Sequence, residues 1–176
     1  MEWQKLIRGN ERWLATYCAL AKFIGWILVF FGVFDLAGGV YMKIFHPTLH
    51  TPGMFLEVVI VMPLARVLLP GMIALVVGAF LQYLLNPDAR PGLLLTHGDK
   101  IFYFAAAIYL VRFGGMLTNM PAVYAQFDGF MDAMYKVAAV VIPEILRPFA
   151  QILIAVGLAQ GLRRMLAAIQ DSKTLV

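Results

Sequence analysis

Five ionisable side chains interrupt long apolar stretches of this sequence, and their types and positions are the ones that could do chemistry. They are Asp35, Arg66, Arg112, Glu144 and Arg147. An arginine at the centre of a lipid-embedded helix costs about 2.5–3.5 kcal/mol on insertion scales, so several facing lipid would be hard to tolerate. We therefore expect these residues to face inward, to pair with one another, or to line a hydrated cavity.

Two interpretations of this charged layer stay open. Glu144 and Arg147 are three residues apart and can pair on one helix. Asp35 is the acid available to Arg66 or Arg112, so three cations meet two anions and one positive charge is left over. One interpretation is an interhelical network that fixes packing and is completed by an acid from a neighbouring subunit. The other is an outward-facing anion site beside prolines that open the helices.

Catalytic side chains are scarce elsewhere. The single serine, Ser172, lies in a polar tail, and one aspartate lies within the apolar stretches, which disfavours serine and paired-aspartate intramembrane proteases. The single cysteine, Cys18, permits neither an intrachain disulfide nor a zinc cluster. No histidine falls within an apolar stretch, so the usual axial ligands of a buried haem are missing. We predict no enzymatic activity and no cofactor.

His46 and His50 are the remaining metal candidates, four residues apart and near Glu57. Pro47 between them disfavours a shared helical face, so we interpret them as loop residues and predict no metal site. The sequence has neither a glycine-rich phosphate loop nor a basic run of the kind that binds nucleic acid. A nucleic-acid partner is therefore not expected.

The elements that carry the charged layer have the composition of membrane helices. Apolar residues make up 62% of the 176-residue chain and charged residues 14%, against about 45–50% and 25% in soluble domains. A span needs about 20 mostly apolar residues. Four segments meet this requirement, at about residues 21–42, 55–85, 101–120 and 137–162. We predict an all-α polytopic bundle of four transmembrane helices, forming one domain over residues 1–176.

The positive charges predict how this bundle sits in the membrane. Nine Lys and Arg residues flank the spans on the side of the two termini, and two, Lys43 and Lys136, lie on the other side. Because cytoplasmic loops carry the excess of Lys and Arg, both termini are predicted to be cytoplasmic. The predicted location is a bacterial inner (plasma) membrane.

Two amphipathic stretches flank the spans. Residues 2–14 place Trp3, Leu6 and Ile7 opposite basic side chains, which suits either an interfacial helix or the amphipathic end of the first span. Residues 124–136 alternate apolar and charged faces at helical spacing. This second stretch is interpreted either as a short helix on the outer surface or as a docking face for a partner.

Small residues and a weak internal repeat bear on packing. Gly157 and Gly161 form a G-x-x-x-G pair, and Ala74 with Gly78 forms a similar small-residue pair, both of which permit close helix contact. The second and fourth predicted spans share an order of apolar run, proline, arginine, proline, Val-Gly and glutamine. This order is either a chance match or a duplication into two parallel two-helix repeats.

The function predicted from these features is a non-catalytic integral membrane subunit of a larger complex. Its partners would be the lipid bilayer and other membrane protein subunits, in a hetero- or homo-oligomer. The alternative is an oligomeric anion channel or transporter that uses the three intramembrane arginines. A third interpretation, a lipid- or quinone-binding module, rests on the aromatic and Met-rich outer segments.

Overall fold

The structure, a computed structural model, describes residues 9–45, 59–86, 90–124 and 142–174. Within these ranges every regular element is a helix and no β-strand occurs. Three helices there are long and apolar enough to cross a membrane: Glu11–Met42, Val59–Leu85 and Leu146–Asp171. The prediction of an all-α protein is thereby confirmed for the described residues, and three of its helices could span a membrane, whereas the count of four spans stays a prediction.

Helix α2 covers Glu11–Phe45 and is the longest element. Its 35 residues extend over about 52 Å at the helical rise, well beyond the roughly 30 Å of a bilayer's hydrocarbon core. Gly9 precedes it in the left-handed region, with φ of 111°, which a helix cannot continue through. Residues 11–14 of the predicted amphipathic stretch therefore belong to α2, and residues 2–8 lie outside the described residues.

The next helix changes its hydrogen-bond register along its length. The π-helix η3 covers Leu64–Leu68 and leads directly into α4, Leu69–Leu85. The Leu69 N–H donates to the carbonyl of Leu64, five residues back. Pro63 and Pro70 flank this turn, and because neither has an N–H, the α-helical ladder is interrupted on both sides of it.

The second half of the chain contains the short helix α5, Leu93–Thr96, followed by α6, Gly98–Tyr124, and α8, Ile142–Thr174. Gly98 begins α6 where three helices meet. A Cβ atom on Gly98 would lie 2.7 Å from Leu162 Cδ2 and 2.8 Å from Val76 Cγ1. A larger residue would force these two side chains to shift, so this close approach packs the start of α6 against both α4 and α8.

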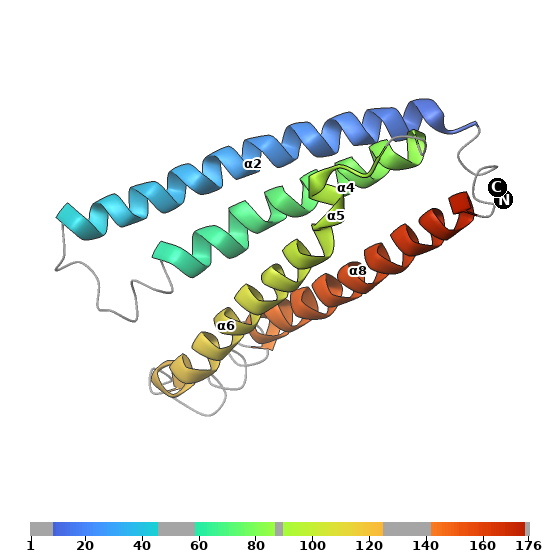
Figure 1. Cartoon of the computed structure of the whole chain (residues 1–176). Helices are drawn as coiled ribbons and strands as arrows, with labels where there is room; N and C mark the ends of the chain where they lie inside the picture. The colour runs from blue at the N-terminus through green and yellow to red at the C-terminus, as the bar shows by residue number, and fades with distance from the viewer. Residues whose placement is uncertain (1–8, 46–58, 87–89, 125–141, 175–176) are drawn as a thin grey trace.

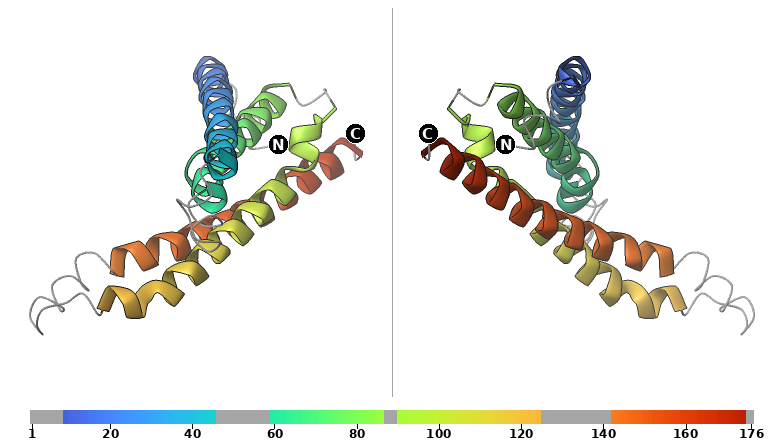
Figure 2. Two further views of the ribbon diagram at one scale, coloured as in Figure 1. Left: turned by 90° about the vertical axis from the view of Figure 1, so that its left-hand side faces the viewer. Right: turned by 90° about the vertical axis from the view of Figure 1, so that its right-hand side faces the viewer.

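These helices form two antiparallel pairs, α2 with η3–α4 and α6 with α8. The start of α2, the end of α4 and the end of α8 lie toward one end of the molecule, and α6 starts nearer its middle (Figure 1). Figure 2 shows that the α6–α8 pair crosses the α2–α4 pair obliquely and diverges from it toward the other end. The pairs are therefore packed together over only part of their length.

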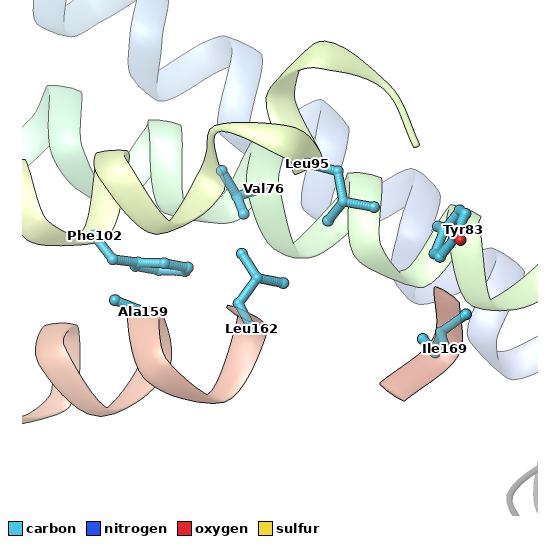
Figure 3. Close-up of a cluster of buried hydrophobic side chains, with 7 residues drawn as sticks. All are labelled: Val76, Tyr83, Leu95, Phe102, Ala159, Leu162 and Ile169. Carbon is cyan, nitrogen blue, oxygen red and sulfur yellow. The ribbon is translucent and has the colours of Figure 1, made fainter. Parts of the chain in front are cut away.

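The core lies where the two pairs meet. One cluster joins α4, α5, α6 and α8 (Figure 3) and consists of Val76, Tyr83, Leu95, Phe102, Ala159, Leu162 and Ile169. A second cluster lies closer to η3 and consists of Ala65, Leu69, Ala105, Ala106, Tyr109 and Ala155. The four alanines of this second cluster allow the crossing helices to approach closely.

Most of α2 is covered by nothing within the described chain. Phe30 and Phe34, for example, are 67% and 70% exposed. Other large apolar side chains exposed on α2 include Trp13, Tyr17, Phe23, Trp26, Phe31, Tyr41 and Phe45. A soluble monomer rarely exposes a continuous apolar patch of more than a few hundred Å². A hydrocarbon environment removes that penalty, which agrees with the length and composition of the helix.

Candidate functional site

Asp35 and Arg66 lie at the same height along two neighbouring antiparallel helices. This height follows from the packing of α2 against η3, where Gly32 lies against Leu68 and Gly39 lies against Val59. Both charged side chains are exposed. Among the residues that the structure describes, no salt bridge joins these two side chains. The acid and the base therefore reach the surface of the molecule.

The remaining members of the charged layer are divided between the surface and the interior. Arg147 is exposed near the start of α8. Glu144 belongs to the same helix, but its side chain lies outside the described residues, so the predicted Glu144–Arg147 pair is not tested. Arg112 on α6 is buried, with 4% of its surface exposed. The three arginines therefore occupy two different environments, two at the surface and one inside.

A hydrogen bond between helices is made where the two pairs cross. The Tyr109 hydroxyl of α6 donates to the carbonyl oxygen of Ala65 in η3, at 3.4 Å. In the π register the donor expected for this carbonyl is residue 70, and Pro70 has no N–H. The α-helical alternative, the N–H of Leu69, donates to Leu64 instead. Tyr109 thus supplies a donor to a buried carbonyl that the local sequence leaves short of one.

Arg112 and Gln151 extend this polar region by one helical turn. Arg112 follows Tyr109 by three residues, so the two side chains share one face of α6. Gln151 stands at about the same level on α8, because the neighbouring Phe113 and Phe149 rings are in contact at 6.4 Å between centroids. The side-chain oxygen of Gln151 is buried without a hydrogen-bond partner in the described structure. Tyr109, Arg112 and Gln151 are thus polar side chains at similar levels where the two helix pairs cross.

The glycines named from the sequence lie in contrasting surroundings. Gly78 on α4 lies against α2, where a Cβ atom would be 2.8 Å from Lys22 Cγ. Beside it the Cys18 thiol donates to the Gly78 carbonyl at 3.2 Å, and the Lys22 ammonium donates to the side-chain oxygen of Gln82. A Cβ atom on Gly157 or Gly161 of α8 would meet no atom within 4 Å, so these two glycines lie on an open face.

A stripe of small residues on α2 was not recognised from the sequence. Cys18, Gly25, Gly32 and Gly39 recur at seven-residue intervals, and all four lie against η3 or α4 or the residues just before them. A Cβ atom on Gly32 would lie 2.9 Å from the backbone nitrogen and Cα of Leu68. The seven-residue spacing was the readable signal, because it keeps one face of a helix toward one neighbour.

Several predicted features lie outside the described residues. They are His46, His50, the loop that carries them, and almost all of the amphipathic stretch at residues 124–136. Within the ranges that are described, no group of three or more His, Cys, Asp or Glu residues could hold a metal ion.

No protein-family model, no curated protein and no solved structure matches this chain. Function is therefore argued from the placement of its own residues. The placement that most needs an explanation is the exposure of Asp35, Arg66 and Arg147 on helices whose other surface residues are largely apolar.

Proposed function

We propose that this chain is a non-catalytic integral membrane subunit of a larger complex. It would contribute helix packing and intramembrane charge pairs to its neighbours. The observation that supports this role is the exposure of Asp35, Arg66 and Arg147 on the surface of the helix pairs. A partner chain with acids opposite the two arginines and a base opposite Asp35 would complete the charged layer.

The energetic argument concerns what these side chains would face without a partner. Three charges directed at lipid would cost up to about 8–10 kcal/mol at the centre of the bilayer. That is comparable with the whole free energy of unfolding of a typical domain, about 5–15 kcal/mol. Movement of long arginine side chains toward the headgroups lowers this cost, whereas the short Asp35 side chain has little such freedom. Pairing with another subunit removes the cost for all three.

The proposal includes four spans, namely the three candidate spans described above and α6, with both termini cytoplasmic in a bacterial inner membrane. Helix α6 has 27 residues, enough for about 40 Å at the helical rise, and lies alongside α8. Its apolar stretch at residues 101–115 contains one charged residue, Arg112. The start of α2 and the end of α8 share one end of the molecule, as an even number of crossings requires (Figure 1). The excess of Lys and Arg on that side supports the cytoplasmic assignment.

The experiment purifies tagged chain in mild detergent from the cells that make it and measures the particle mass by light scattering. We expect a mass well above the 19.6 kDa of the chain, with another membrane protein in fixed stoichiometry. Asp35→Asn and Arg66→Gln should release that protein, because each removes one member of a charge pair. Arg163→Gln, an exposed arginine beyond the charged layer, is the matched control and should retain it. A stable monomer in mild detergent, with no partner lost on mutation, would contradict the proposal.

Anion conduction is the second candidate, and the burial of Arg112, one helical turn from Tyr109 on α6, favours it. A buried cation among polar groups is a feature of ion pathways in membrane proteins. The exposure of Arg66 and Arg147 weighs against a single path lined by all three arginines. Reconstituted vesicles should show anion flux that falls in Arg112→Met but not in Arg163→Met. Flux unaffected by Arg112→Met would remove this candidate.

A further inference from the structure

A groove opens between α4 and α8 and is separate from the charged layer. It encloses about 210 Å³. Its lining comes from three helices and includes Val77, Phe80, Phe102, Gly157, Gly161 and Met165. Val77, Leu158 and Met165 are all exposed, so the groove opens sideways onto the surface that would face lipid. We call it the lateral groove.

Two glycines of α8 create the lateral groove. The Cβ positions of Gly157 and Gly161 meet open space within 4 Å, so any side chain there would project into the volume that is now empty. Neither glycine is required by a left-handed backbone, since both lie within a regular helix. The main effect of glycine at these positions is therefore to leave space in the groove for another molecule.

The lining and size of the groove indicate a single hydrocarbon chain. Its wall is apolar side chain and glycine, and apolar cavities do not hold water. Pockets for compact small molecules are larger, about 300–1,000 Å³, and carry a few polar groups that orient the ligand. A volume of 210 Å³ without such groups suits a segment of an acyl chain, which is also the molecule most abundant beside a membrane helix.

A cation lies on the same helix face as the glycines. Arg164 is exposed and follows Gly157 by seven residues and Gly161 by three, which are spacings that share one face of a helix. It also directly precedes Met165, which lines the groove. Arg163 is also exposed but is placed six and two residues after the two glycines, on the opposite side of α8.

We propose that the lateral groove binds one acyl chain of an anionic glycerophospholipid whose phosphate is held by Arg164. The charge complementarity of Arg164 with the phosphate selects the anionic headgroup, and the glycine-made groove retains the chain. Because Arg164 lies toward the end of α8, the lipid belongs to the leaflet at that end, which the positive charges assign to the cytoplasm. This inference rests on the proposed membrane placement but not on the proposed partner.

The test uses the full chain in mild detergent, delipidated and then incubated with phosphatidylglycerol or phosphatidylcholine of identical acyl chains. Native mass spectrometry counts the lipids that stay bound. An arginine at the membrane surface contributes about 1 kcal/mol toward an anionic lipid, so we expect phosphatidylglycerol to be retained about fivefold more strongly. Arg164→Gln should abolish that preference, and Gly157→Leu should reduce retention of both lipids by filling the groove.

Two control variants match these changes. Arg163→Gln removes the neighbouring arginine on the other side of α8 and should keep the fivefold preference. Gly114→Leu places the same side chain at another glycine whose Cβ position is open, on α6 away from the groove, and should bind as the original chain does. Helical circular dichroism verifies that every variant is folded.

Three results would overturn the proposal. They are equal retention of the two lipids by the original chain, equal loss in Arg163→Gln and Arg164→Gln, and unchanged retention in Gly157→Leu. If Gly157→Leu leaves lipid retention unchanged but dissociates a dimer, the groove would instead be the contact site for a second copy of the chain. This assay measures bound lipid and not a bound protein partner. A negative result would therefore contradict the lipid proposal without bearing on the subunit proposal.

Discussion

The two helix pairs use glycine in opposite ways. In the α2–α4 pair, Gly25, Gly32 and Gly71 bring backbones together, and a Cβ atom at any of them would meet a neighbour at 2.8–2.9 Å. In the α6–α8 pair, Gly114, Gly157 and Gly161 have open space where a Cβ atom would be. The first pair therefore uses these three glycines for packing within the chain, whereas the second leaves these three on its surface and packs Gly98 at the start of α6.

The difference teaches how to read small-residue motifs in membrane helices. Lipid is as apolar as the side chains it surrounds, so helices associate through close packing and not through burial of apolar surface. A glycine that is pressed against a neighbour contributes to that packing. A glycine with open space contributes nothing to the chain's own contacts, and it leaves a surface on which a lipid or another protein can pack.

The contrast between the two pairs predicts its largest change in the free energy of unfolding at Gly32. Gly32→Val places side-chain atoms against the backbone of Leu68, where the Cβ atom alone would be 2.9 Å away. We expect a loss of about 3 kcal/mol in the free energy of unfolding, because a backbone contact cannot move aside. The measurement is unfolding in mixed detergent micelles, followed by helical circular dichroism.

Gly38→Val is the matched control for Gly32→Val. Gly38 lies on the same helix, six residues away, and has no atom within 4 Å of its Cβ position. Gly38→Val should change the free energy of unfolding by less than about 0.5 kcal/mol. Equal losses at the two positions would mean that α2 does not pack on η3 through this face.

A smaller effect is expected where the two pairs are joined. Tyr109→Phe removes the hydroxyl that donates to the Ala65 carbonyl and should cost about 1 kcal/mol of unfolding free energy. In a Pro70→Ala background residue 70 has an N–H again, and this N–H can donate to the Ala65 carbonyl within the helix. The cost of Tyr109→Phe should then fall below about 0.5 kcal/mol. A cost that is the same in both backgrounds would refute this role of Tyr109.

The smallest effect, of opposite sign, is expected in the α6–α8 pair. Gly157→Ala and Gly114→Ala should each stabilise the isolated chain by about 0.5–1 kcal/mol, since alanine is the better helix former and meets no neighbour at either site. The measurement is again unfolding in mixed micelles. Destabilisation of the isolated chain by either change would show that these glycines do pack within it.

Part of this arrangement was predictable because lipid constrains sequence strongly. A span must satisfy its backbone hydrogen bonds internally and present apolar side chains, so composition alone indicates helices in a membrane. The same constraint makes Asp35, Arg66 and Arg112 conspicuous in the sequence. Their directions were not predictable, because a charged residue faces inward or outward according to which neighbour its helix packs against. Arg112 is buried, while Asp35 and Arg66 are exposed.

The glycines illustrate the same limit. Gly78, Gly157 and Gly161 all belong to small-residue motifs at four-residue spacing, and the sequence supplies no reason to separate them. The structure places Gly78 against Lys22 and leaves Gly157 and Gly161 open. The change in hydrogen-bond register at Leu64–Leu68 does have a signal in the sequence, namely Pro63 and Pro70. Its partner Tyr109, 44 residues from Ala65, could be identified only once the helices had been placed.

The amino-acid sequence by itself determined that this protein is helical and that its helices suit a membrane, because local composition and the demand for internal hydrogen bonds decide both. Tertiary structure alone decided which side chains of each helix meet a neighbour. That choice depends on contacts between residues far apart in the chain, such as Gly32 with Leu68 and Tyr109 with Ala65. It is why two pairs of similar helices differ, one with Gly25, Gly32 and Gly71 in contact and the other with Gly114, Gly157 and Gly161 open.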